Sequence, residues 1–181
     1  EERDAMKWPG GNPVIAHPPC RAWGRLRHFA KPRPGEMDLA RWAVKQVRRW
    51  GGVLEHPATS KLWEDQNLPE PNQRDEWGGW TLQVPQWWWG HRADKPTRFY
   101  ICGCDPRELP EIPFKMGVSD CVIRLDTRRA DGTYVRKGDP DYKPRLAKAE
   151  REATPPELAR WLVELASICR QNMNYPEGNS R

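Results

Sequence analysis

A helical repeat of apolar residues spans residues 36–50, and a short apolar run lies on either side of it. The apolar side chains of the repeat fall on one helix face: Leu39, Trp42, Ala43, Val47 and Trp50. Gly51-Gly52 supplies a C-terminal stop, and the runs at 14–16 and 53–54 are short enough to be buried strands. A strand, a helix and a strand in this order predict a right-handed crossover unit with two parallel strands.

The remaining segments add strands and one more helix. We expect strands at 84–89 and 97–102, and a β-hairpin in which 121–125 and 133–136 flank Asp131-Gly132. Thr154, Pro155 and Glu157 have the capping-box pattern that begins a helix. The 181 residues therefore predict a single α/β domain over 1–181. Its expected parts are a core with the chemical motifs at 12–105, a Pro-rich loop and hairpin at 106–145, and a C-terminal helix at 154–170.

Chemically reactive side chains follow both strands of the crossover unit. Cys20 comes after the first strand, in His17-Pro18-Pro19-Cys20, and Glu55-His56 ends the second. Because open α/β sheets bind ligands at the edge where parallel strands end, we expect Cys20 and Glu55 to converge there, with both histidines beside them. A thiolate can add to C6 of a pyrimidine and make C5 nucleophilic, while a carboxylic acid stabilises the charge at N3. A structural thiol and a carboxylate paired with a loop arginine are the alternative interpretations.

Basic residues cluster directly after Cys20: Arg21, Arg25, Arg27, His28, Lys31 and Arg33. The whole chain has 30 Lys and Arg against 25 Asp and Glu, an excess with the sign that suits a nucleic-acid partner. Positive charge beside Cys20 would favour its thiolate, and the loop would contact DNA phosphates; a solvated loop is the alternative. A second basic cluster is a candidate for a second DNA contact: Arg124, Arg128, Arg129, Arg136 and Lys137. The 11 tryptophans suit core packing or base stacking.

The five cysteines are an odd number, and no apolar run in the first 30 residues resembles a signal peptide. No segment approaches the ~20 apolar residues of a membrane span. These features predict a soluble cytoplasmic protein with free thiols and no membrane partner. Cys102, Cys104 and His91 are residue types that bind zinc, but their spacing favours core packing, and we expect no metal site.

Several segments, in order, resemble motifs of the DNA cytosine-C5 methyltransferases. His17-Pro18-Pro19-Cys20 resembles the Pro-Pro-Cys catalytic loop, and Leu54-Glu55-His56-Pro57 resembles the Glu-Asn strand end, with His56 where Asn is usual. Residues 95–103 resemble a later strand, in which Arg98 matches the second of two arginines and Pro96 stands at the first. Residues 154–159 faintly resemble the last motif. The set also resembles small bacteriophage-encoded proteins related to these enzymes.

This resemblance implies a reduced Rossmann-like, methyltransferase-like fold, with a mostly parallel sheet, flanking helices and a β-hairpin insertion. It implies that Cys20 adds to C6, Glu55 engages N3 and Arg98 positions the catalytic side chains. It also implies S-adenosylmethionine as cofactor, DNA as partner and, for a phage protein, the bacterial host cytoplasm as location. The expected substrate-binding residues are His17, Pro19, Arg21, Arg25, Arg27, His56, Lys95 and Thr97.

One departure from the family concerns the cofactor. The Gly-rich turn that holds S-adenosylmethionine is missing, because Gly10-Gly11 does not follow a strand. A missing N-terminal piece, a different cofactor and loss of methyl transfer all account for this. The sequence therefore leaves two alternatives to a transferase. One is a non-catalytic DNA-binding module on the same scaffold, and the other is an enzyme acting on a free pyrimidine nucleotide.

Overall fold

The fold is that of a computed structural model, which describes residues 4–24, 27–123, 128–172 and 175. The chain divides into two compact units. Unit 1 comprises residues 1–84, 97–111 and 161–181, and unit 2 comprises residues 85–96 and 112–160. The single domain over 1–181, with its three expected parts, stays a prediction.

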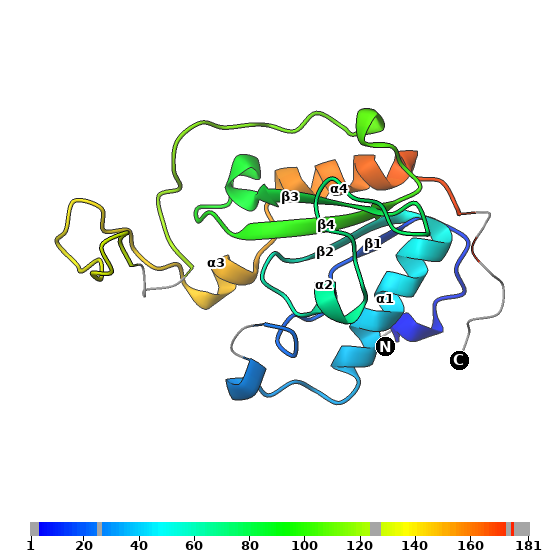
Figure 1. The fold of residues 1–181 in the computed structure, drawn as a ribbon, viewed down its shortest axis with the longest axis horizontal. Helices are drawn as coiled ribbons and strands as arrows, with labels where there is room; N and C mark the ends of the chain where they lie inside the picture. Colours follow the sequence, from blue (N-terminus) through cyan, green and yellow to red (C-terminus); the bar gives the residue numbers. More distant parts are fainter. Residues whose placement is uncertain (1–3, 25–26, 124–127, 173–174, 176–181) are drawn as a thin grey trace. The chain divides into compact units, whose positions relative to one another are not determined.

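A four-stranded sheet has the order β1-β2-β4-β3 (Figure 1). Its strands are β1 (Val14–Ala16), β2 (Gly52–Pro57), β3 (Trp80–Pro85) and β4 (Pro96–Cys102). β1 and β2 are parallel, whereas β2 and β4 are antiparallel. The α/β class is thus confirmed, but the prediction of a mostly parallel sheet is wrong and the sheet is mixed. Apolar runs indicate where strands lie and not in which direction each one pairs.

The β1-α1-β2 crossover is present as predicted. Helix α1 (Glu36–Trp50) has the predicted bounds, and its buried residues Ala40, Ala43 and Val44 pack with Leu54 of β2. At Gly52, φ is +113° and a Cβ would collide with the backbone of Val14, so this close approach of β2 to β1 requires glycine. Helices α1 and α2 (Leu62–Asp65) cover one face of the sheet and α4 (Pro156–Ile168) covers the other (Figure 1).

Two sequence predictions need local corrections. Residues 84–89 are not a strand, because β3 ends at Pro85 and a 3₁₀ helix, η3 (Gln86–Trp89), follows it. The last helix spans Pro156–Ile168 and is shorter than the predicted 154–170 at both ends. The backbone N–H of Ala159 bonds the carbonyl of Pro155 at 2.9 Å, and the helix begins at Pro156. Short 3₁₀ helices also occur at η1 (Ala5–Lys7), η2 (Arg27–Phe29) and η4 (Pro106–Glu108).

Unit 2 contains η3, the short helix α3 (Lys148–Glu152) and a small apolar cluster of Ala93, Cys121 and Leu146. The predicted β-hairpin is present only as a turn. Arg128 and Tyr134 form a single antiparallel bridge, while Val122 pairs in parallel with Arg145 instead. Residues 124 and 125 of the predicted first strand lie outside the described residues. In the described part of the chain, every helix is too short or too polar to cross a membrane.

Candidate functional site

The segments that follow β1 and β2 meet at one edge of the sheet. The backbone N–H of Lys61, after β2, donates to the carbonyl of Trp23, after β1, at 2.9 Å. Cys20 lies at the start of this second segment, and its carbonyl accepts hydrogen bonds from the N–H groups of Trp23 and Gly24, both at 3.0 Å. The Cys20 turn is therefore fixed against the chain that leaves β2, as expected for the ends of two parallel strands.

Arg21 links the Cys20 turn to the start of α1. Its guanidinium lies 3.0 Å from Oε1 of Glu36, which is buried at the first position of the helix. A carboxylate at a helix N-terminus is stabilised by the helix dipole, and the ion pair adds to this stabilisation. Arg21 was expected to bind phosphate, and the structure gives it an anchoring contact while about half of its side chain, 48%, stays exposed.

Glu55 lies in a small polar network on the α4 face of the sheet. In β-sheet register it pairs with Phe99, whose ring packs against Trp161 of α4 with centroids 5.6 Å apart. His17 Nδ1 lies 3.2 Å from Glu55 Oε2, and the hydroxyl of Thr97 donates to Glu55 Oε1 at 3.2 Å. The carboxylate is mostly buried, with 14% of its side chain exposed. Three predicted site residues are thus brought together: Glu55 of β2, Thr97 of β4 and His17, which directly follows β1.

His56 points to the opposite face of the sheet, because successive strand residues alternate. Its ring is fully buried, and neither ring nitrogen has a hydrogen-bond partner. Burial lowers the pKa of His56 to about 4, against a smaller opposing effect of the Glu55 charge. His56 is therefore neutral at pH 7 and sealed from solvent, which does not suit the substrate contact expected for it.

Arg98 pairs in register with His56, so it too lies on the face away from Glu55. Its two terminal nitrogens bond both carboxylate oxygens of Glu70 at 2.8 and 3.0 Å, and its Nε bonds Gln83 at 2.8 Å. The structure therefore does not bring Arg98 to Glu55, although it was expected to position the catalytic groups. The sequence motif marks the residue but not the face on which its side chain lies.

The remaining predicted contacts are distributed between the units. Pro19 lines a groove described below, and Arg27 is half-buried in η2. Arg25 lies outside the described residues. Lys95 belongs to unit 2, where its ammonium group donates to the carbonyl of Ala153 at 3.0 Å.

The five thiols differ in exposure. Cys20 is exposed, whereas Cys102, Cys104, Cys121 and Cys169 are buried. Burial raises the pKa of Cys102 and of Cys169 to about 12, and it also raises the pKa of Cys104. Thiolates are the nucleophilic form, so Cys102 and Cys169 are unreactive at neutral pH, and burial also disfavours the thiolate of Cys104. Exposure singles out Cys20 as the thiol able to meet a substrate.

A groove of about 920 Å³ runs along β1 and α1 and ends at His17-Pro18-Pro19. Sequence reasoning missed it. Trp8 is fixed by an edge-on contact with Trp50, with ring centroids 6.3 Å apart, so the N-terminal segment forms one wall. The signal for this groove in the sequence was the pair of tryptophans Trp8 and Trp42, which are both half-buried in the structure. Residues lining the groove include Asp4, Trp8, Ile15, Pro19, Leu39 and Trp42.

No cluster of three or more His, Cys, Asp or Glu side chains is arranged to hold a metal ion among the residues that the structure describes. Comparison with known protein families, curated proteins and solved structures finds no match for this chain.

Proposed function

We propose that this chain modifies a pyrimidine base of DNA at C5, through a covalent bond between Cys20 Sγ and C6 of the base. One observation supports this most directly. The ends of two parallel strands meet at one edge, where His17 Nδ1 lies 3.2 Å from Glu55 Oε2 and Lys61 bonds Trp23. The finer assignment of a reduced Rossmann-like scaffold belongs to this proposal, because β1-α1-β2 is the crossover that such a ligand edge requires.

Cys20 has the role of nucleophile. Its exposure and its anchored turn give an incoming base a thiol at a fixed position. The thiolate of Cys20 forms the Sγ–C6 bond, the C5=C6 π electrons shift to C4=C5, and the C4=N3 π electrons move to N3, which takes the proton of the Glu55 carboxyl. The enamine carbon C5 then attacks the electrophile, whose leaving group departs with the electron pair of the bond that breaks. Water takes the C5 proton, the electrons of that C–H bond restore C5=C6 and expel Sγ as a thiolate, and N3 returns its proton to the Glu55 carboxylate.

Glu55 has the role of the acid at N3, and its neighbours fix its orientation. His17 contacts one carboxylate oxygen and Thr97 donates to the other, so these two side chains fix the plane of the Glu55 carboxyl group. A mostly buried carboxyl group in a hydrogen-bonding network is a common form of catalytic acid. His17 and Thr97 act here as positioning residues.

The groove beside β1 fits a nucleoside-containing donor. Its volume is that of a typical small-molecule site, and the indoles of Trp8 and Trp42 offer faces for an adenine ring. Asp4 and Lys7 both line the groove, so its wall offers a carboxylate for a sulfonium group together with an ammonium group of opposite charge. S-adenosylmethionine, when bound, supplies an electrophilic methyl group. These residues would hold it without the Gly-rich turn that the chain lacks.

A second candidate function is a DNA-binding module without catalysis. The engagement of Arg98 with Glu70 and Gln83, on the face away from Glu55, favours it. In this case the Cys20 turn would be a structural remnant of the fold.

Exchange of the cytosine C5 hydrogen with water separates these functions without needing any donor. Addition of a thiolate at C6 makes C5 basic enough to take a solvent proton, so tritium at C5 is released into water. We expect the protein to release tritium from DNA that contains [5-³H]cytosine, Cys20→Ser to release none, and Glu55→Gln to release it at least ~10-fold more slowly.

The matched control is Cys104→Ser, which removes a buried thiol whose Sγ lies 3.3 Å from the carbonyl of Asp105, a contact that serine can keep. This variant retains exchange. If the unchanged protein releases no tritium from DNA, the transferase proposal fails. Exchange on deoxycytidine monophosphate with none on DNA would instead identify a free-nucleotide enzyme.

A further inference from the structure

Positive charge is concentrated in one stretch of unit 2. Residues 128–145 contain six Lys and Arg against three Asp, a net charge of +3 within a chain whose formal net charge is +5. Unit 1 as a whole has nearly equal numbers of both signs, with 17 Lys and Arg and 16 Asp and Glu. We call residues 128–145 the basic loop.

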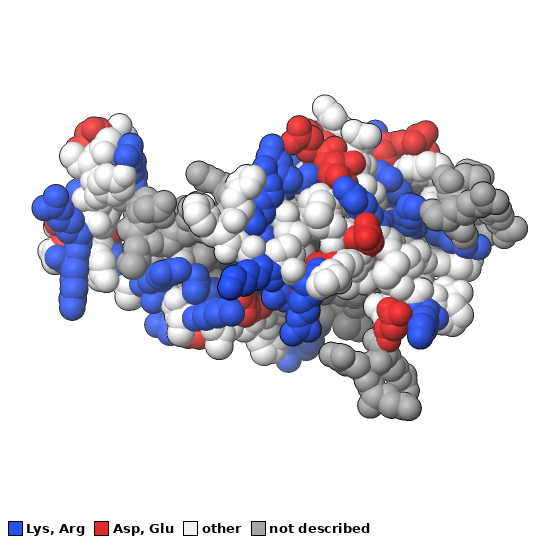
Figure 2. Space-filling view, turned by 90° about the horizontal axis from the view of Figure 1, so that it is seen from below, with Lys and Arg blue, Asp and Glu red and all other residues white. Residues whose placement is uncertain are grey.

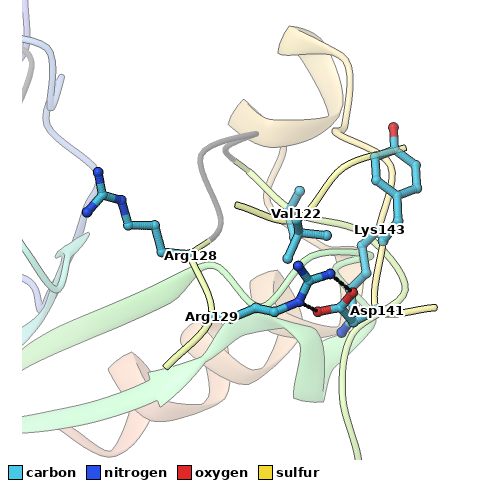
Figure 3. A pocket seen from close by; sticks show the side chains of 7 residues that line it. Val122, Arg128, Arg129, Asp141 and Lys143 are labelled. Carbon is cyan, nitrogen blue, oxygen red and sulfur yellow. Dashed lines mark hydrogen bonds and ion pairs between the residues drawn. The ribbon is translucent and has the colours of Figure 1, made fainter. Parts of the chain in front are cut away.

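The acidic residues of the basic loop are bound within the loop itself. Arg129 bonds Asp141 through two nitrogens at 2.6 and 2.8 Å (Figure 3). It also bonds Asp139 through one nitrogen at 2.6 Å. The third, Asp131, accepts bonds from the backbone N–H and hydroxyl of Thr133. One guanidinium thus gathers two carboxylates, and we call this arrangement the Arg129 cage.

Four of the loop's other five cations are exposed, namely Arg128, Arg136, Lys137 and Arg145, whereas Lys143 is half-buried and lines a pocket. Figure 3 shows the guanidinium of Arg128 directed away from Arg129, and it lies 4.6 Å over the ring of Tyr134, which is 49% exposed. Arg136 and Lys137 are exposed and form no ion pair with the residues that the structure describes. The basic loop is coloured yellow in Figure 1 and lies at the left edge of Figure 2. Lysine and arginine side chains are visible there, with a few acidic side chains among them.

We propose that the basic loop binds the phosphodiester backbone of DNA, with Arg128, Arg136 and Lys137 as the phosphate contacts. The Arg129 cage pairs two of the loop's carboxylates with a guanidinium, although their side chains stay 32% and 49% exposed. The loop keeps a net charge of +3, which attracts an approaching phosphate. Tyr134 holds Arg128 in place through the cation–π contact and offers a ring beside the backbone. This inference extends the proposed function, because it names where in the chain the DNA partner is bound.

The basic loop presents no rigid helix or two-stranded ribbon for reading base sequence. Its one internal bridge joins Arg128 to Tyr134, and Arg145 at its end pairs with Val122 outside the loop. Guanidinium and ammonium groups on a turn suit contacts that position a protein on DNA. Binding through these groups is therefore expected to depend strongly on salt and little on sequence.

The experiment measures the affinity for a fluorescein-labelled DNA duplex by anisotropy between 50 and 200 mM salt, concentrations over which phosphate contacts differ greatly in strength. The variant is Arg136→Ala/Lys137→Ala, which removes two exposed side chains outside the cage. Each lost phosphate contact lowers the steepness of log K against log salt by about 1, so we expect a reduction of about 2. Circular dichroism checks that the variant folds.

The control is Arg107→Ala/Arg170→Ala, which removes the same charge from unit 1, where both side chains are highly exposed at 90% and 81%. We expect its salt dependence to match that of the unchanged protein. An equal reduction in both variants, no reduction in either, or no binding of the duplex at all overturns the proposal. If the reduction is confined to the basic loop but tritium exchange is absent, this inference stands and the transferase function fails.

Discussion

Units 1 and 2 differ in how their chain is held in place. Unit 1 contains the sheet and an apolar cluster that includes Leu54, Leu62 and Tyr100, and charged groups sit around it in nearly equal numbers. In unit 2, the basic loop is organised around a single guanidinium that binds two carboxylates. The difference indicates two uses. Apolar packing fixes side chains such as Cys20 and Glu55 at a strand edge, whereas ion pairs order a turn and leave its cations at the surface.

The largest expected effect compares leucines from the two units. Leu54→Ala removes a fully buried side chain from the large cluster of unit 1, and we expect the free energy of unfolding to fall by about 2–5 kcal/mol. Leu146→Ala acts on the small cluster of Ala93, Cys121 and Leu146, and we expect a smaller loss. Urea unfolding of both variants measures this, and an equal or larger loss for Leu146→Ala would contradict the contrast.

A pH effect of about 3 kcal/mol is expected from His56 in unit 1, because burial lowers its pKa from 6.5 to about 4. Between these two values the unfolded chain binds a proton that the folded chain does not, so stability is complete above pH 6.5 and falls as the pH decreases toward 4. His56→Asn should flatten this dependence in urea unfolding at pH 7, 5.5 and 4.5.

The quantity to compare between the variant and the unchanged protein is the slope of the free energy of unfolding against pH. The free energy at a single pH is not suitable, because His56→Asn also changes core packing. His28→Asn, at an exposed position, serves as the control and should keep the slope of the unchanged protein. Identical slopes in all three proteins would show that His56 is solvated in the folded state.

A local effect is expected in unit 2 from Arg129→Ala, which removes the centre of the Arg129 cage. Asp139 and Asp141 then lose their partner, and backbone amides such as that of Thr133 should exchange hydrogen faster. Amides of β2 in unit 1 should be unchanged. Hydrogen exchange followed by mass spectrometry measures the exchange rates of both segments. Unchanged amide exchange in the basic loop would mean that the ion pairs of Arg129 do not order it. We also expect weaker DNA binding, because the two carboxylates become available to repel phosphates.

The smallest effect is expected from Arg98→Lys. Lysine cannot keep the two-pronged contact with Glu70, but exposed ion pairs contribute about 0–1 kcal/mol, and 60% of the Glu70 side chain is exposed. Because Arg98 lies on the face away from Glu55, we expect tritium exchange at C5 to be unchanged. A fall of ~10-fold or more in exchange, with stability retained, would assign Arg98 to the site after all.

Much of the local structure could be predicted from sequence. The bounds of α1 followed from its apolar stripe and Gly51, and the parallel pairing of β1 and β2 followed from the crossover rule. The network of His17, Glu55 and Thr97 was in part foreseen, because all three were named as site residues. The groove beside β1 was not, because it is formed by an N-terminal segment whose position no periodic pattern encodes.

The sequence by itself determined the crossover unit and the residue types at its strand ends, because periodicity and chain connectivity are local properties. Glu55 and His56 lie on opposite faces because neighbouring strand residues alternate, but only the tertiary structure decided which face each one takes and that Arg98 shares the face of His56. It also decided that Arg129 among the basic-loop arginines binds Asp139 and Asp141. Which face a strand residue occupies and which carboxylate a cation meets depend on register and on distant segments, and neither is encoded in a short stretch of sequence.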